Sequence, residues 1–293
     1  MTKTAWVFPG QGSQAKGMGV DLLDLPTART QFDRAQAILG WSVLQLCQEG
    51  GEKLSRTLYT QPSLYVVETI LVDLLREKGR QPDIVAGHSL GEYVALYTAG
   101  VIDFETGLRL VKRRAELMDT AAGGEMAALM KFDRAQLDDL IQQTEGIVLA
   151  NDNSAQQVVI SGTPTALDAV LGQVKAKRAV KLDVSGAFHS PLMAPAALEF
   201  QQVLNPIAFA DAKIPVLSNV DPTPATDGNF LKDRLLRQMT GSVRWREICL
   251  RLTEEGVEAT VEVGPGKVLA GLLKRTCSGM ALENVSSIAD IPA

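Results

Sequence analysis

A serine between glycines, Gly87-His88-Ser89-Leu90-Gly91, separates an apolar run from a helix-like stretch. The run at residues 84–86 is typical of a buried strand, and residues 92–99 are typical of a helix. Glycines on both sides of a serine allow a sharp, strained turn that lifts the hydroxyl clear and leaves the next N–H free. The pattern predicts a nucleophile elbow, and it favours covalent acyl chemistry over a structural turn.

A serine nucleophile needs a base, and the sequence contains only two histidines. His88 directly precedes Ser89, so its side chain leaves the backbone on the opposite face; it could line the pocket or pack beneath the turn. His189 follows an apolar strand, in a turn of small residues. A lone loop histidine is commonly a surface residue, but here no other imidazole is available. We therefore predict a Ser89–His189 dyad.

Strand-like and helix-like segments alternate along the 293 residues, among them a helix expected near residues 64–78 and a strand expected at residues 214–219. This alternation predicts an α/β fold with a parallel sheet. Residues 126–184 instead have the order β-α-β-β-α-β, with helices at 134–143 and 164–175, as in a ferredoxin-like unit. We expect an α/β-hydrolase-like large domain formed by residues 1–124 and 190–293. A ferredoxin-like small subdomain is expected to be inserted at residues 125–189.

Composition limits the class of partner. Charged residues make up 22% and hydrophobic residues 46%, as in a folded globular protein, and the formal net charge is −5. Without a basic tract, nucleic-acid binding is not expected. The sequence has no signal-peptide pattern and no apolar run of membrane-spanning length, so we expect no membrane association and a cytoplasmic or organelle-stroma location. Its three scattered cysteines suggest neither disulfides nor a zinc site.

Two glycine-rich segments suggest other ligands. Gly10-Gln11-Gly12-Ser13-Gln14-Ala15 fits a variant of the dinucleotide fingerprint, but the helix and second strand that a βαβ unit requires do not follow at the right distance. Gly264-Pro265-Gly266-Lys267 resembles a phosphate loop, but Val268 stands where a Walker sequence needs serine or threonine. Neither a nicotinamide nor a nucleotide is expected.

Ordered motifs along nearly the whole chain resemble those of one family. They are Phe8-Pro9-Gly10-Gln11-Gly12-Ser13-Gln14, Thr60-Gln61-Pro62-Ser63-Leu64, Gly87-His88-Ser89-Leu90-Gly91-Glu92, Val111-Lys112-Arg113-Arg114, Gly124-Glu125-Met126-Ala127-Ala128, Ala187-Phe188-His189-Ser190 and Glu262-Val263-Gly264-Pro265-Gly266-Lys267-Val268-Leu269. The chain resembles malonyl-CoA:acyl carrier protein transacylases, a family that includes acyltransferase domains of fatty acid and polyketide synthases. The resemblance implies ping-pong transfer of malonyl from CoA to the carrier's phosphopantetheine thiol through a malonyl-serine, supplying fatty acid synthesis.

The resemblance also implies roles for further residues. The backbone N–H groups of Gln11 and Leu90 would hold the oxyanion, and Arg114 would bind the malonyl carboxylate through two parallel hydrogen bonds. Gln238 would orient His189 through its backbone carbonyl, so changes of the Gln238 side chain are expected to be mild. Replacing Arg114 is expected to spare Ser89 reactivity while ending the preference for malonyl.

Other pocket residues follow from the same resemblance. Phe188 would leave no room for an α-methyl branch, which would disfavour methylmalonyl-CoA, although a phenylalanine of the core would look the same. Gln61, Asn153 and Asn219 match family positions near the pocket. Ala155 stands where the family usually has proline, and this departure weakens the case for Asn153.

The expected partners are malonyl-CoA and an acidic, phosphopantetheinylated acyl carrier protein, and the chain is expected to be a monomer. Two cationic clusters are candidates for carrier docking: Lys175, Lys177, Arg178 and Lys181, and Lys267, Lys274 and Arg275. No metal or other cofactor is expected, because the CoA thioester is itself a substrate. The alternatives are a serine hydrolase or thioesterase, which has no use for Arg114, a polyketide-pathway acyltransferase, and a binding module without turnover.

Overall fold

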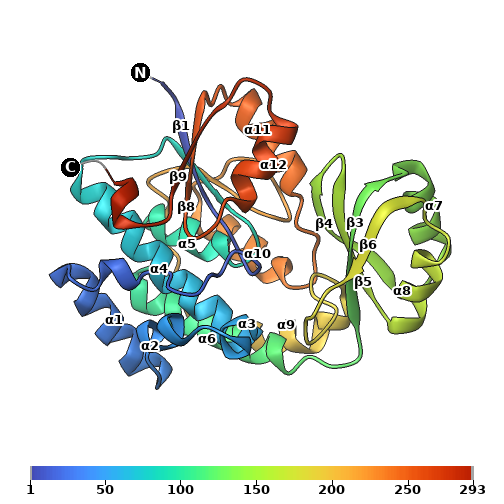
Figure 1. The fold of residues 1–293 in the computed structure, drawn as a ribbon, viewed down its shortest axis with the longest axis horizontal. Coiled ribbons are helices and arrows are strands. Elements are labelled where there is room, and N and C mark those ends of the chain that lie inside the picture. Colours follow the sequence, from blue (N-terminus) through green and yellow to red (C-terminus); the bar gives the residue numbers. More distant parts are fainter. Residues whose placement is uncertain (1, 292–293) are drawn as a thin grey trace.

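The computed structural model of the protein describes residues 2–291 and contains two sheets that lie side by side (Figure 1). One sheet has five strands in the order β7-β2-β1-β8-β9, and the other has four in the order β4-β5-β3-β6. No helix among residues 2–291 is both long and apolar enough to span a bilayer.

The five-stranded sheet is parallel throughout. Its strands are β1 (Thr4–Phe8), β2 (Ile84–Gly87), β7 (Val216–Leu217), β8 (Ala259–Val263) and β9 (Ala281–Val285). Successive side chains of a strand point to opposite faces, so β1 contributes Trp6 and Phe8 to one core and Ala5 and Val7 to another. Both faces of the sheet are therefore buried.

Helices cover the two faces of this sheet (Figure 1). The helices of this part of the chain are α1 (Pro26–Leu39), α2 (Val43–Glu49), α3 (Glu52–Ser55), α4 (Thr57–Glu77), α5 (Gly91–Thr98), α6 (Phe104–Asp119), α9 (Ala194–Leu204), α10 (Gly228–Gln238), α11 (Trp245–Glu254) and α12 (Val268–Thr276). Helices α1, α2 and α3 pack on α4 rather than on the sheet itself. Helices α4, α6 and α9 belong to the core of Trp6 and Phe8, whereas α11 and α12 pack against Ala5 and Val7. Short 3₁₀ turns occur at Val20–Leu22, Pro191–Met193 and Ile288–Asp290.

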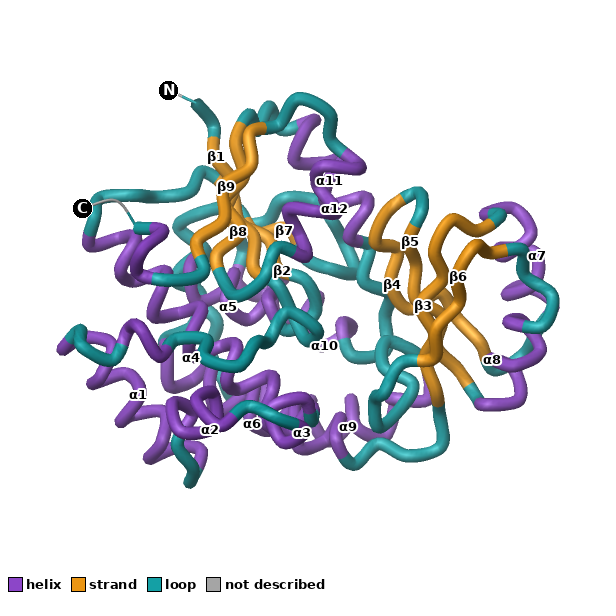
Figure 2. Tube along the Cα trace, viewed as in Figure 1, coloured by secondary structure: helices purple, strands orange, loops and turns teal. Residues whose placement is uncertain are grey.

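The four-stranded sheet is antiparallel. Its elements are β3 (Glu125–Phe132), α7 (Arg134–Gln143), β4 (Ile147–Ser154), β5 (Gln157–Gly162), α8 (Pro164–Leu171) and β6 (Ala176–Lys181). Both helices lie on the outer face, away from the large sheet (Figure 2), where Ala127 and Leu129 join their core. Met126 and Met130 alternate with these residues and line a pocket on the inner face.

These sheets confirm the expected fold class, a parallel α/β unit with a ferredoxin-like antiparallel sheet. Counted along the small sheet, the strands lie in the order second, third, first, fourth, which is the order of a ferredoxin-like unit. The elements of this sheet fall at residues 125–181, and the expected domain boundaries at 124/125 and 189/190 stay a prediction.

Several expected bounds were wrong. Helix α4 begins at Thr57 rather than near residue 64, because the helix accommodates Pro62. The strand expected at residues 214–219 is only Val216–Leu217, and the helix expected to reach residue 175 ends at Leu171. Helix α9 and strand β9 were not expected. Strand β9 lies at the sheet edge and keeps several side chains exposed, so it lacks the apolar run that identifies a buried parallel strand.

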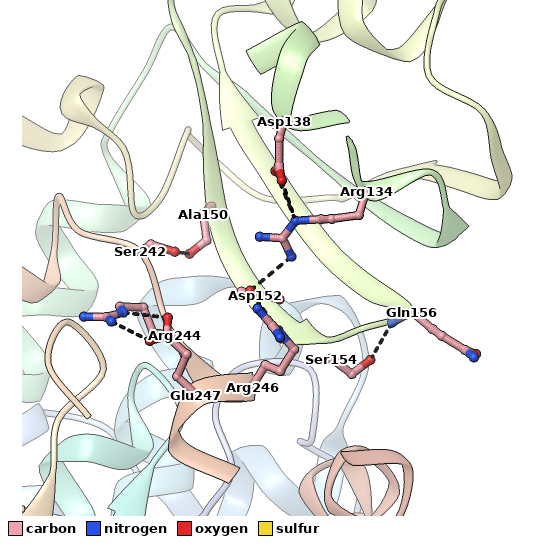
Figure 3. Close-up of polar contacts among 10 residues, drawn as sticks. All are labelled: Arg134, Asp138, Ala150, Asp152, Ser154, Gln156, Ser242, Arg244, Arg246 and Glu247. Carbon is pink, nitrogen blue, oxygen red and sulfur yellow. Dashed lines mark hydrogen bonds and ion pairs between the residues drawn. The ribbon is translucent and has the colours of Figure 1, made fainter. Parts of the chain in front are cut away.

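The two sheets are joined at strand β4, which lies beside the segment before α11 (Figure 3). The backbone N–H of Asp152 donates to Val243 O, and the N–H of Val243 donates to Ala150 O. The buried Asp152 carboxylate also accepts from Arg134 Nη1 of α7 and Arg246 Nε of α11, each at 3.1 Å. Asp152 therefore links a helix of each part of the molecule.

Candidate active site

Ser89 stands at the turn between β2 and α5, and its backbone is strained. Its φ of 52° lies in the left-handed region, which costs a non-glycine residue about 1–3 kcal/mol. The flanking glycines make the turn possible by close approach: a Cβ on Gly87 would lie 1.9 Å from Gly91 C, and one on Gly91 would lie 2.0 Å from Phe8 O. The predicted elbow is present, with the strain on the serine itself.

The two residues predicted as a dyad are in contact. Ser89 Oγ lies 2.8 Å from His189 Nε2, and His189 Nδ1 lies 2.9 Å from the backbone oxygen of Gln238 and 3.2 Å from that of Gly241. Because both carbonyls can only accept, the proton sits on Nδ1 and leaves Nε2 free to accept the serine proton. Burial, with the nearby Arg114 cation second, lowers the pKa of His189 to about 3. The imidazole is therefore a neutral base at ordinary pH.

Two backbone N–H groups beside Ser89 have no acceptor among residues 2–291, and both residues line the same pocket as the dyad. They belong to Leu90, directly after the nucleophile, and to Gln11, in the loop after β1. The loop approaches closely because residue 10 is glycine: a Cβ there would lie 2.5 Å from His88 O. The pair is placed to donate to an oxyanion formed at Ser89.

Arg114 of α6 is 1% exposed and lies against the nucleophile. Its Nη2 donates to Ser89 Oγ at 2.9 Å and to Gln238 Oε1 at 3.1 Å, and its Nη1 donates to Gln61 Oε1 at 2.7 Å. Nε has no hydrogen-bond partner in the described part of the chain. The buried guanidinium is thus held only by neutral groups and faces the pocket.

The helix position distinguishes Arg114 from its cationic neighbours. Lys112 Nζ donates to Ile38 O, and Arg113 pairs with Glu199 at 2.7 Å on the surface. Only Arg114 lies on the face of α6 that packs inward, where its guanidinium is 5.5 Å from the centre of the Tyr93 ring. Of these three cations, Arg114 is the one placed to meet a ligand in the pocket, in agreement with the residue that the family motif indicated.

Gln238 does more than the sequence suggested. Its backbone oxygen accepts from His189 as expected, but its side chain is also fully engaged: Nε2 donates to Ser89 O at 2.9 Å and to Glu92 Oε2 at 2.7 Å. Its Oε1 accepts from Arg114. These contacts favour larger effects of side-chain changes than the mild ones first expected, because removing a buried amide with three partners leaves those partners unsatisfied.

The remaining predicted residues also gather at the site. Asn219 Oδ1 accepts from the Ser89 N–H at 2.7 Å, and its Nδ2 donates to Gly87 O at 2.6 Å. One amide therefore holds the backbone of the turn at two positions. Asn153 Oδ1 lies 2.8 Å from His88 Nε2. This contact supports a place for Asn153 at the site despite the departure from the family pattern at Ala155. Phe188 is buried and lines the pocket.

The pocket has a volume of about 340 Å³ and lies between the two sheets. Its floor carries the dyad, Arg114 and the oxyanion loop. Sequence reasoning missed its apolar wall, which consists of Met126, Met130, Val159, Leu182 and Val184 from the small sheet and its connection, and Val268, Leu269 and Leu272 from α12. The alternation of residues 126–130 was the available signal, but it did not reveal what the inner face would meet.

Comparison with known proteins agrees with this geometry. Residues 5–292 match the model of the acyl transferase domain. The chain belongs to the acyl transferase domain family. It is 59% identical over 289 residues to the malonyl CoA-acyl carrier protein transacylase of Synechocystis sp., with 99% of each chain covered. The Escherichia coli protein of the same name is 40% identical, with 99% of this chain and 98% of that one covered.

Solved structures give the same result for this acyltransferase fold. The crystal structure of the Synechocystis sp. malonyl-CoA:ACP transacylase superposes with a TM-score of 0.97 at 59% identity, with 99% of each chain covered. A malonyl-transacylase in complex with a type II polyketide synthase acyl carrier protein superposes with a TM-score of 0.93 at 38% identity, covering 99% of this chain and 98% of that one.

Proposed function

We propose that this acyltransferase transfers a malonyl group from malonyl-CoA to the phosphopantetheine thiol of an acyl carrier protein, for fatty acid synthesis. The observation that carries the proposal is the buried Arg114 guanidinium, 2.9 Å from Ser89 Oγ and without an acidic partner among residues 2–291. A buried cation whose hydrogen-bond partners are all neutral favours an anionic ligand. An acyl chain that ends in a carboxylate brings that anion next to the nucleophile.

The first half-reaction follows from the dyad. His189 Nε2 accepts the Ser89 proton as Oγ attacks the thioester carbonyl, and the N–H groups of Gln11 and Leu90 receive the negative charge of the tetrahedral intermediate. The C–S bond then breaks, and the imidazolium protonates the departing CoA thiolate. The malonyl group remains as an ester on Ser89.

The second half-reaction runs the same steps with a different thiol. His189 accepts the proton of the carrier's thiol, the thiolate attacks the ester carbonyl, and the proton returns to Ser89 Oγ as the C–O bond breaks. One neutral imidazole therefore serves both directions, and the scheme calls on no metal or other cofactor. Phe188 beside the base restricts the space around the α-carbon, so methylmalonyl is expected to be a poorer acyl group.

We propose that the cationic cluster near α12 binds the carrier protein. Lys267 directly precedes Val268 and Leu269, which line the pocket, and Lys274 and Arg275 lie near the end of the same helix. Arg178 pairs in register with Met130 and so shares the inner face of the small sheet. Lys181 belongs to the outer face, where it pairs with Glu125 and Asp168. We therefore assign the acidic carrier to Lys267, Lys274, Arg275 and Arg178.

The test of the function is intact-protein mass spectrometry after brief mixing with malonyl-CoA. A malonyl adduct on the wild type and none on Ser89→Ala is the expected result. Adding a phosphopantetheinylated carrier protein should move the malonyl mass from the enzyme to the carrier. An adduct that water removes as fast as the carrier does would instead support the serine hydrolase alternative.

The docking surface has a matched test of its own. Lys267→Glu with Lys274→Glu should raise the KM for the carrier at least about tenfold, and more than the KM for malonyl-CoA. Lys175→Glu with Lys177→Glu, from the other cluster, is the control and should change neither constant appreciably. An effect of the control pair equal to that of the α12 pair would contradict the assignment.

A further inference from the structure

Glu92 is a buried carboxylate in the first turn of α5, three residues after Ser89, and the reaction scheme gives it no role. Its exposed fraction is 0%. Its Oε2 accepts from Gln238 Nε2 at 2.7 Å and from the backbone N–H of Asn219 at 3.1 Å. Burying a carboxyl group costs free energy unless hydrogen bonds compensate for the lost water, so its two partners indicate its role.

Each partner of Glu92 holds a reacting part of the site. Asn219 accepts from the Ser89 N–H and so supports the turn that raises the hydroxyl. Gln238 contacts Ser89 O, the Nη2 of Arg114 and, through its backbone oxygen, the Nδ1 of His189. The Glu92 carboxyl group therefore supports the nucleophile, the base and the guanidinium through Asn219 and Gln238, and it makes no direct hydrogen bond to those three groups.

The chemistry of the Gln238 amide makes this support directional. Oε2 of Glu92 also accepts from the backbone N–H of Asn219, so it acts as an acceptor and the NH₂ end of Gln238 must face it. The oxygen end is then presented to Arg114 Nη2 at 3.1 Å, as observed. Burial raises the pKa of Glu92, and the hydrogen bond from Gln238 and the Arg114 charge oppose that rise. If position 92 could also donate, the amide could turn over by giving up its hydrogen bond to Ser89 O, and its NH₂ would then meet the guanidinium, donor against donor.

Charge adds a second effect. Burial lowers the pKa of Arg114, and the Glu92 carboxylate counteracts this by favouring the charged guanidinium. The two groups are separated by the Gln238 amide rather than paired directly. This arrangement places a carboxyl group near Arg114 while leaving the guanidinium free for a substrate carboxylate.

We propose that Glu92 is a positioning residue for recognition of the acyl carboxylate: it fixes the orientation of the Gln238 amide, and that amide holds Arg114 in the pocket beside Ser89. This inference rests on the proposed malonyl transfer. Its distinctive consequence is that the loss of Glu92 should reduce use of a carboxylate-bearing acyl group more than use of acetyl.

The test compares Glu92→Gln with Glu92→Asp and the wild type, using single-turnover acylation of Ser89 by malonyl-CoA and by acetyl-CoA. Glu92→Gln is expected to lower the ratio of malonyl to acetyl kcat/KM by about 10- to 100-fold. Glu92→Asp keeps an acceptor-only group and should recover part of that ratio. Glu68→Gln is the matched control, because Glu68 is equally buried, has no hydrogen-bond partner for its carboxyl group among residues 2–291 and is not one of the residues that line the pocket.

A double-mutant cycle gives the decisive readout. If Glu92 acts through Arg114, the selectivity losses of Glu92→Gln and Arg114→Ala should not add, and the double variant should match Arg114→Ala within about twofold. Equal losses with malonyl-CoA and acetyl-CoA, or a fully additive cycle, would overturn the proposal and leave Glu92 a structural residue. Should Glu92→Gln not fold, the same cycle is run with Glu92→Asp. Failure of the wild type to acylate Ser89 would count against the proposed function, and the two failures are thereby distinguished.

Discussion

Replacement of Arg114 by alanine is the sharpest perturbation that the structure offers. The guanidinium would pair with the substrate carboxylate inside a pocket where it is 1% exposed, and truncating one partner of a buried, hydrogen-bonded charge pair costs about 2–5 kcal/mol. Taking about 3 kcal/mol predicts a loss of about 150-fold in kcat/KM for malonyl-CoA. Acetyl-CoA carries no carboxylate, so it escapes this loss.

Acetyl transfer should nevertheless suffer slightly. The 2.9 Å hydrogen bond from Arg114 Nη2 to Ser89 Oγ disappears in the variant, and a bond of this kind contributes about 1 kcal/mol, or about fivefold. The expectation that Ser89 reactivity would be spared is therefore revised. This smaller loss applies to malonyl transfer as well and cancels in the ratio of malonyl to acetyl kcat/KM, which should therefore fall by about 150-fold.

The assay measures the rate of acyl-enzyme formation by intact mass after rapid mixing with each donor. Arg113→Ala is the control on the same helix, because its side chain pairs with Glu199 on the surface and surface pairs contribute little. Its selectivity should stay within about twofold of the wild type. Equal losses with both donors in Arg114→Ala would refute the carboxylate role and leave the arginine as a partner of Ser89 alone.

Three further predictions concern the base, the elbow and the junction. Because the pKa of His189 is lowered to about 3, neutral base persists as the pH falls, and acylation should not lose activity between pH 8 and about pH 5; a midpoint near 6.5 would contradict this. Gly91→Ala should lower the free energy of unfolding by about 3 kcal/mol in thermal melts, since its Cβ would meet Phe8 O. Gly271→Ala in α12 is the control and should raise it by about 0.5–1 kcal/mol, because its Cβ would make only an ordinary contact with Arg275 at 3.9 Å. Asp152→Asn should cost about 1–2 kcal/mol in urea unfolding, and its exposed neighbour Asp138→Asn under about 0.5 kcal/mol; equal costs would deny the junction its role.

Acid stability follows from the same histidine with a definite sign. His189 binds a proton at higher pH in the unfolded chain than in the folded protein, because folding lowers its pKa to about 3. Its contribution to stability is therefore present above about pH 6.5 and is lost progressively as the pH falls toward 3.

Much of the fold was predictable because its signals are local. Hydrophobic periodicity located helices such as α7 and α12 at their observed bounds, and the β-α-β-β-α-β order predicted the small sheet. Signals weakened at sheet edges, where β9 keeps polar side chains exposed, and around Pro62, whose accommodation inside α4 depends on the packing of that helix. Boundary errors therefore fell where tertiary context overrides local preference.

Local sequence patterns were enough to identify the nucleophile and the base of this acyltransferase. Two histidines and one elbow serine left little choice of nucleophile or base, whereas the oxyanion donors Gln11 and Leu90 followed from the family resemblance. Tertiary structure alone decided the relations among residues far apart in the chain: the second role of Gln238, the burial of Arg114 but not Arg113, and the link from Glu92 to both. Short-range sterics fix a turn or a helix, but a hydrogen bond between residues 92 and 238 exists only once the core has brought α5 and α10 together.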